Sequence, residues 1–120
     1  VKVFTFVDSN DVLAVTQSAV QSCQALYIPT DNTAASNTEL INSVTEPAKI
    51  PIVAGEEGIC KGCGVATLSI SYYDIGYKAV ETIVKILQGE TVDKFVDTGT
   101  EIVTKDNAQD RIDRLNSYLK

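Results

Sequence analysis

Short runs rich in β-branched residues alternate with longer segments of helical periodicity, and this alternation constrains the fold more than any single motif. The runs that predict strands are Val3–Val7, Ala25–Ile28, Ile50–Ala54, Val65–Ile70 and Glu101–Thr104. The segments that predict helices are one capped by Ser9 or Asp11, then Ala34–Val44, Asp74–Leu87 and Ala108–Leu119. Because strands and helices take turns along the chain, we expect an α/β fold with a mostly parallel sheet covered by helices.

The length and charge of the chain limit its class. Its 120 residues, 44% of them hydrophobic, suit one globular domain, so residues 1–120 are expected to form a single lobe. The net charge of −6 comes without a basic stripe, which argues against nucleic acid as a partner. No apolar run approaches the ~20 residues of a membrane span, and the first residues lack the features of a signal peptide. The chain is expected to be a piece of a longer protein.

The cysteine content predicts neither a metal site nor a cofactor. The three cysteines are Cys23, Cys60 and Cys63, and the last two form a CxxC in a segment that its glycines predict to be a loop. Zinc normally needs four ligands, and the chain has no histidine and one further cysteine. Incidental thiols are the favoured interpretation, and a local disulfide or reactive pair stays open.

Polar residues follow four of the predicted strands. Asp8 to Asn10, Thr30 to Thr33, Glu56 with Glu57, and Ser71 to Tyr73 each come directly after such a run. Right-handed crossovers bring the ends of parallel strands to one edge, where ligands of open α/β sheets usually bind. Helix capping is the competing interpretation. It explains Ser9 and Thr33 well, but it explains the adjacent Glu56 and Glu57 poorly.

Three motifs in order resemble the substrate-binding proteins of ABC transporters, specifically the tryptophan/tyrosine-type subfamily with a type 1 periplasmic-binding-protein fold. They are YIPTDNTAAS, KIPIVAGEEG and GVATLSISYYDIGYKAVETIVKILQGE, within a match over Val3–Ile102. The resemblance implies a three-layer flavodoxin-like lobe with helices on both faces, equivalent to the C-terminal half of a two-lobe protein. The first lobe and the start of the second have no counterpart in this chain. The CxxC is not part of the family pattern.

The resemblance also implies what such a protein does. Its members bind a small molecule such as an aromatic amino acid outside the cytoplasm, are anchored by an N-terminal lipid, and deliver cargo to ABC permease subunits. The helix equivalent to Asp74–Leu87 packs on the first lobe in that arrangement. In this chain we expect the helix to fold back on the sheet or to be exchanged in a domain-swapped homodimer.

Carried onto this sequence, the resemblance implies a ligand site at the C-terminal edge of the sheet. Asp31 and one of Glu56 or Glu57 would accept hydrogen bonds from an α-ammonium group, and Tyr72 would offer an aromatic face. The predicted donors are Thr30, Asn32, Thr33 and Ser71. The family often has aspartate where this chain has Ser71, which leaves the ligand open.

Three alternatives belong to other classes. An enzyme is not expected, because nucleophilic or acid–base chemistry would need a histidine, or a cysteine with a base beside it, and the chain has no histidine. Glu56 and Glu57 could form a carboxylate pair, but neighbours in sequence usually point apart. A receiver-like signalling domain would have Lys105 after its last strand, but Asp8 lacks the acidic neighbour that such a domain needs. The chain could also be a non-binding structural or oligomerisation fragment.

Overall fold

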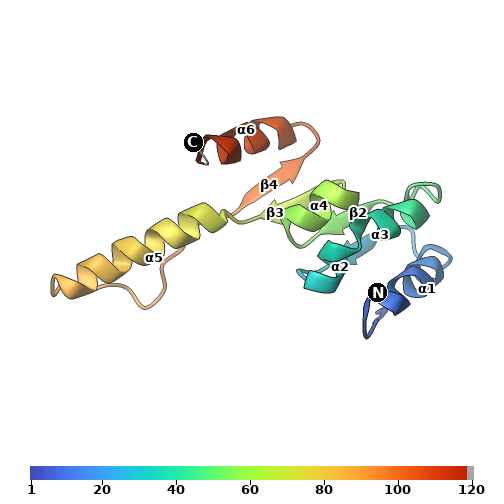
Figure 1. Ribbon diagram of the computed structural model, residues 1–120, viewed down its shortest axis with the longest axis horizontal. Helices are drawn as coiled ribbons and strands as arrows, with labels where there is room; N and C mark the ends of the chain where they lie inside the picture. Colours follow the sequence, from blue (N-terminus) through green and yellow to red (C-terminus); the bar gives the residue numbers. More distant parts are fainter. Residues whose placement is uncertain (119–120) are drawn as a thin grey trace.

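The computed structural model describes residues 1–118 and contains a four-stranded sheet (Figure 1). The strands lie in the order β1 (Leu26–Ile28), β2 (Ile52–Ala54), β3 (Ala66–Ser69) and β4 (Glu101–Thr104). The first three are parallel, and β4 runs antiparallel to β3. The structure confirms the predicted α/β class and the mostly parallel sheet, with strand bounds within two residues of those predicted.

Six helices accompany the sheet in the described residues. They are α1 (Ser9–Val20), α2 (Asn32–Ser36), α3 (Thr38–Thr45), α4 (Glu57–Cys63), α5 (Tyr72–Leu87) and α6 (Ala108–Tyr118). Leu119, the predicted end of the last helix, lies outside the described residues. Helices α1 to α4 share one buried core with β2, formed by Val12, Ala34, Ile41, Ile52, Ala54 and Ile59.

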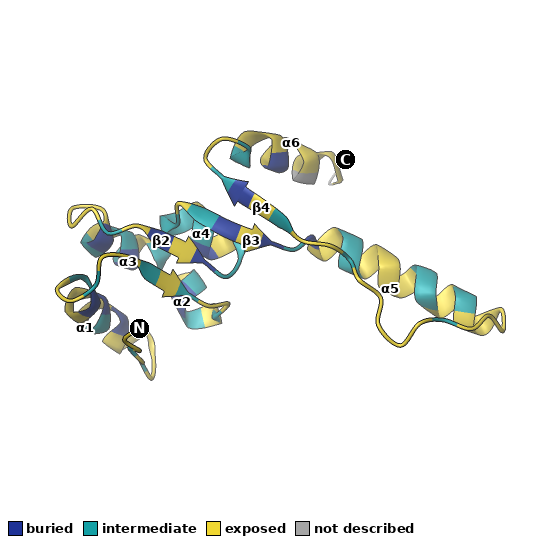
Figure 2. Cartoon of the chain, turned by 180° about the vertical axis from the view of Figure 1, so that it is seen from behind, coloured by how far each residue is buried: buried dark blue, intermediate teal, exposed yellow. Residues whose placement is uncertain are grey.

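The two faces of the sheet have different surroundings. Ile52 and Ala54 point to the helix-covered face and are almost fully buried. Tyr27 and Val53 are paired in register and point to the opposite face, where they are exposed, as are Leu68 and its partner Ile102. Figure 2 shows buried and exposed segments following one another along β2 and β3. We call this second side the open face. Helices on both faces were expected, whereas in residues 1–118 this face keeps large apolar side chains in solvent.

The prediction of a strand at Val3–Val7 is wrong. Residues 3–7 have no strand partner, and β1 forms the edge of the described sheet. A run of suitable residues becomes a strand only where a neighbour accepts its hydrogen bonds. The segment is still anchored, since Phe6 packs against the core and the Val7 amide donates to Asp11 Oδ2 at 3.1 Å.

The prediction of a Gly-rich loop around the cysteines is also wrong, because residues 57–63 form α4. Glu56 caps this helix by accepting from the Gly58 and Ile59 amides, and the Ile59 side chain is fully buried against the core. Burial and capping outweigh the low helix propensity of glycine. The CxxC therefore lies within a helix.

The predicted helix Ala34–Val44 is two helices with a break at Asn37. The backbone of Asn37 leaves the helical region at φ −124°, and its side-chain amide donates to the Thr33 carbonyl at 2.7 Å and to Ser9 Oγ at 3.0 Å. Asparagine competes with helical hydrogen bonding in this way. The break turns α3 toward α1 and α4, the helices it contacts most.

Helix α5 projects away from the sheet (Figure 1). None of its 16 residues is buried, and Tyr77, Val80, Ile83 and Leu87 expose about half or more of their surface. The radius of gyration is 17.8 Å, against about 14 Å for a compact domain of this length. Gly89, with φ +81°, ends the helix as predicted, and residues 88–100 lead the chain back to β4.

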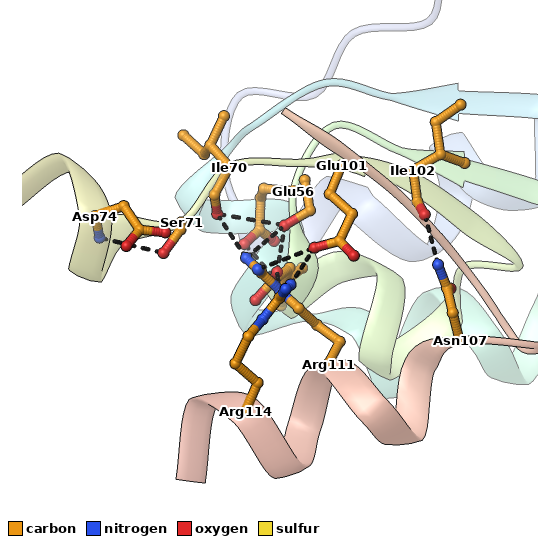
Figure 3. A network of polar contacts seen from close by, with 12 residues as sticks. Glu56, Ile70, Ser71, Asp74, Glu101, Ile102, Asn107, Arg111 and Arg114 are labelled. Carbon is orange, nitrogen blue, oxygen red and sulfur yellow. Dashed lines mark hydrogen bonds and ion pairs between the residues drawn. The ribbon is translucent and has the colours of Figure 1, made fainter. Parts of the chain in front are cut away.

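Arg111 of α6 holds the chain together where α5 departs and β4 returns (Figure 3). Its side chain is 7% exposed, and Nε donates to Glu57 Oε1 at 2.7 Å. The two terminal nitrogens donate to Glu101 Oε2 at 3.2 Å, and to Ser69 Oγ and the Ile70 carbonyl at 3.3 Å each. This Arg111 network connects α6, α4, β4 and the end of β3.

Gly55 lies where β2 ends, against the loop after β1. A Cβ atom there would come within 2.6 Å of the Thr30 backbone nitrogen and 2.9 Å of the Pro29 carbonyl carbon. Backbone cannot move aside as a side chain can, so Gly55→Ala should lower the free energy of unfolding by about 1–3 kcal/mol. Gly76→Ala, in open space on α5, should be neutral or stabilising by up to about 1 kcal/mol. Urea denaturation followed by circular dichroism measures both, and equal effects would contradict the prediction.

Arg111→Met should destabilise the chain much more than a matched change on the same helix. The variant leaves Glu57 and Ser69 without their cationic partner in a mostly buried site, which should cost about 2–4 kcal/mol. Arg114 also pairs with Glu101, but its side chain is 45% exposed, so Arg114→Met should cost about 0–1 kcal/mol. Similar denaturation midpoints for the two variants would show that the network contributes little to stability.

Candidate functional site

The structure brings the sequence-predicted residues to one edge of the sheet. β1 leads into Thr30, Asp31, Asn32 and Thr33, β2 into Glu56 and Glu57, and β3 into Ser71 and Tyr72. These strands are parallel neighbours, so the three loops lie side by side. Thr30 Oγ1 donates to the Gly55 carbonyl at 3.1 Å and joins the first two loops.

Three of these residues are helix N-caps. Asp31 Oδ1 accepts from the Ala34 amide at 2.8 Å in α2, and Ser71 Oγ accepts from the Asp74 amide at 3.2 Å in α5. Glu56 caps α4 with both carboxylate oxygens. The expectation that capping explains Glu56 poorly is therefore wrong. A carboxylate accepts up to about four hydrogen bonds, so the cap leaves acceptor capacity on Asp31.

The expected caps Ser9 and Thr33 are also wrong. Asp8 caps α1 by accepting from the Asn10 amide at 2.8 Å, and Asp31 caps α2. In both helices the cap lies one or two residues before the predicted one. Ser9 Oγ instead accepts from the Asn37 side chain. The first turn of α1 is thereby connected to the junction between α2 and α3.

Glu57 differs from its neighbour because its side chain joins the Arg111 network. Oε1 accepts from Arg111 Nε and from Ser69 Oγ. Sequence analysis missed Arg111 entirely. One feature of the sequence could have revealed its role: Arg111 comes three residues after Ala108, on a helix face where an apolar residue would be usual. Glu57 therefore acts first as a structural partner of α6.

The other predicted residues face solvent to different degrees. Thr30 and Asn32 are exposed, and Thr33 is half-buried. The Tyr72 ring is 62% exposed, whereas Tyr73 stacks on Tyr118 with ring centroids 4.1 Å apart. Ser71 is buried. Exposed polar groups after β1 and the exposed Tyr72 after β3 thus lie at the same edge of the sheet, where such groups can accept hydrogen bonds, donate them, or stack on a ring.

The thiols of the CxxC are protonated at neutral pH. Burial raises the pKa of Cys63 to about 11, with a smaller contribution from Cys60. Burial also raises the pKa of Cys60, and the nearby Glu57 and Glu56 carboxylates raise it further. Both thiols are free in the structure. A raised pKa removes the thiolate that redox or nucleophilic chemistry needs, which favours incidental thiols.

In residues 1–118, no three His, Cys, Asp or Glu side chains gather as they would around a metal ion. Each helix within these residues is too short or too polar to cross a membrane.

Comparison with known proteins identifies the family of this chain. The family model described as ABC transporter substrate binding protein matches residues 1–109. A tyrosine-binding protein from Clostridioides difficile (strain R20291) is 33% identical over an alignment of 108 residues, and the match covers 88% of this chain and 31% of that protein. The chain therefore spans about a third of the length of this relative.

Solved structures agree on the fold. A ligand-free, open substrate-binding protein with adhesive properties from Clostridium difficile is 32% identical, with a TM-score of 0.67 over 87% of this chain and 37% of that one. An ABC domain in complex with L-Trp from Streptococcus pneumonia is 24% identical, with a TM-score of 0.70 over 91% of this chain and 38% of that one. A family match over residues 1–109 and a relative at 33% identity point to one conclusion: the chain belongs to the ABC transporter substrate-binding protein family.

Proposed function

We propose that this chain forms one wall of the solute-binding cleft of an ABC importer and that the solute is an aromatic amino acid such as tyrosine. The observation that carries this proposal is the gathering of Thr30, Asp31, Asn32 and Tyr72 at the edge where β1, β2 and β3 end. The tyrosine-binding relative supports the choice of ligand.

Each group at the edge has a role in this proposal. Asp31 accepts from the α-ammonium group with the acceptor capacity that capping leaves. Asn32 and Thr33 donate to the α-carboxylate, and Tyr72 stacks on the aromatic side chain. The Thr30 hydroxyl already donates to the Gly55 carbonyl and joins the first two loops. Glu56, Glu57 and Ser71 hold their loops in place, because their side chains already bond within the chain.

The remainder of the proposal concerns the whole protein. We infer a two-lobe, extracytoplasmic, lipid-anchored parent that delivers its solute to permease subunits, with residues 1–120 as its C-terminal lobe. A single wall encloses a ligand on one side, so affinity in the isolated chain should be low. The family match sets the receiver-like alternative aside. The remaining alternative is a fragment that binds no solute, and titration with L-tyrosine distinguishes it from the proposed site.

The apolar surface of α5 needs a partner both in the parent protein and in the isolated chain. Its Val80, Ile83 and Leu87 side chains are exposed at helical spacing along one row, and grouped exposed apolar side chains are typical of interaction sites. We propose that α5 packs on the first lobe in the parent protein. In the isolated chain it packs on a second copy, which produces an exchanged dimer.

Asp31→Asn is the sharpest test of the ligand site. Asparagine caps a helix as well as aspartate does, so the variant keeps α2 and removes only the charge. L-tyrosine should shift the NMR amide signals of Thr30–Thr33 and Tyr72, and the substitution should weaken binding by about tenfold or more through loss of a charge-assisted hydrogen bond. Glu39→Gln, on the exposed side of α3, is the matched control. Unchanged tyrosine affinity in Asp31→Asn would exclude the assigned role.

Analytical ultracentrifugation tests the dimer. The wild-type chain should sediment as a dimer that dissociates on dilution, because α5 buries its apolar surface only in the pair. Ile83→Glu should give a monomer at every concentration, since it places a charge in the middle of that surface. Lys78→Gln, an exposed change on the same helix, should leave the dimer intact. A wild-type monomer at high concentration would refute the exchange.

A further inference from the structure

A half-open groove of about 570 Å³ lies between α4, β3, β4 and α6, and we call it the α4–α6 groove. Much of its apolar lining faces solvent, because Val65 is 55% and Ile112 40% exposed, whereas Val103 lies deeper and is 7% exposed. Pockets for small molecules have about this volume. Of the residues assigned to the candidate ligand edge, only Glu57 lines the groove, so the two features are separate.

The charge of the α4–α6 groove is opposite to that of the whole chain. The chain has 16 acidic and 10 basic residues and a net charge of −6. Among the described residues that line the groove, the basic ones are Lys61, Lys105 and Arg111, and Glu57 is the one acidic residue. Arg111 and Glu57 neutralise each other, because Arg111 Nε donates to Glu57 Oε1 at 2.7 Å. The groove therefore keeps the positive charges of its two lysines.

Lys61 and Lys105 lie toward the same end of the groove. Lys61 is in the last turn of α4, which ends shortly before β3 begins. Lys105 directly follows β4, whose last residue, Thr104, pairs in register with Ala66 at the start of β3. Both lysine side chains are exposed, and in the described part of the chain neither forms an ion pair. Two unpaired ammonium groups thus border one end of an apolar surface.

The start of α6 adds to the positive potential at this end. α6 begins at Ala108, which lines the groove, and the first backbone N–H groups of a helix carry partial positive charge. The Asn107 side chain precedes them but bonds back to the backbone around β4. Asp106 and Asp110 are exposed near this first turn, and neither lines the groove. The end near the lysines therefore favours a negative group.

We propose that the α4–α6 groove is a second binding site, for a small amphipathic anion of the kind represented by a medium-chain fatty acid. The carboxylate lies at the end bordered by Lys61 and Lys105, and the hydrocarbon chain covers Val65 and Ile112. A hydrophilic anion would leave the apolar lining in solvent, and an uncharged apolar molecule would leave both ammonium groups without a partner. A molecule with both parts removes apolar surface from water and forms charge-assisted hydrogen bonds.

Titration with octanoate and with 1-octanol tests the site, because the two probes have the same chain length and differ in their head group. Methyl NMR signals of Val65, Val103, Ala108 and Ile112 should shift and saturate with both probes. Octanoate should bind about 2–10-fold more tightly at low salt, the value of one or two exposed ion pairs. Sodium chloride should reduce this difference, because salt screens exposed charges. L-tyrosine should leave these signals unchanged, so the result does not depend on the amino-acid site.

A double variant, Lys61→Gln with Lys105→Gln, should lower the octanoate affinity to that of 1-octanol and leave 1-octanol unchanged. Its matched control is Lys78→Gln with Lys85→Gln, which removes the same charge from α5, away from the groove. The control should keep the difference between the two probes. Ile112→Glu, at a partly exposed position, should weaken octanoate more than 1-octanol, because it places a carboxylate in the groove.

Equal wild-type affinities for octanoate and 1-octanol would overturn the proposal, and so would octanoate signals that do not saturate. A double variant that keeps the preference for octanoate would also overturn it, as would a control that loses this preference. The same holds if the shifts gather at Val80 and Ile83 of α5, or on the open face at Leu68 and Ile102.

Discussion

The first backbone N–H groups of a helix have no partner within it, and this need organises the edge of the sheet where β1, β2 and β3 end. Asp31, Glu56 and Ser71 each satisfy it for the helix that follows their strand. A side chain fixed by a cap has already lost its rotamer freedom. In the proposed site, its remaining acceptor positions would meet a ligand with little further ordering, so that one loop could serve both capping and recognition.

The Arg111 network gives the fold its second constraint. The chain leaves the sheet after β3, runs out through α5, and returns on β4, whose Glu101 pairs in register with Ser69. Arg111 contacts both residues and so fixes departure and return beside each other. Buried ion pairs are often no more stabilising than well-packed apolar residues. The value of this one is geometric, because it holds the end of β3, where the chain leaves toward α5, beside the start of β4.

An element can be predicted from the sequence when residues close to it in the chain determine its structure. α5 and β4 follow from local pattern, and the shared edge follows from the rule for parallel strands. α4 was missed because the burial of Ile59 and the Glu56 cap override a glycine-rich sequence. The prediction of a strand at Val3–Val7 failed because a strand needs a neighbouring strand to accept its hydrogen bonds, and the local sequence does not show whether one is present. Arg111 was missed because its partner Glu57 is 54 residues away, a separation that no sequence window spans.

The edge formed by β1 bears on how this chain behaves in a crowded solution. Exposed sheet edges beside apolar faces recruit other chains into growing ladders, the first step toward fibres. Here the edge is three residues long, and Pro29, which cannot donate a backbone hydrogen bond, follows it at once. An edge this short offers few backbone hydrogen bonds to another chain. The open face can therefore remain available to a partner without committing the protein to indefinite polymerisation.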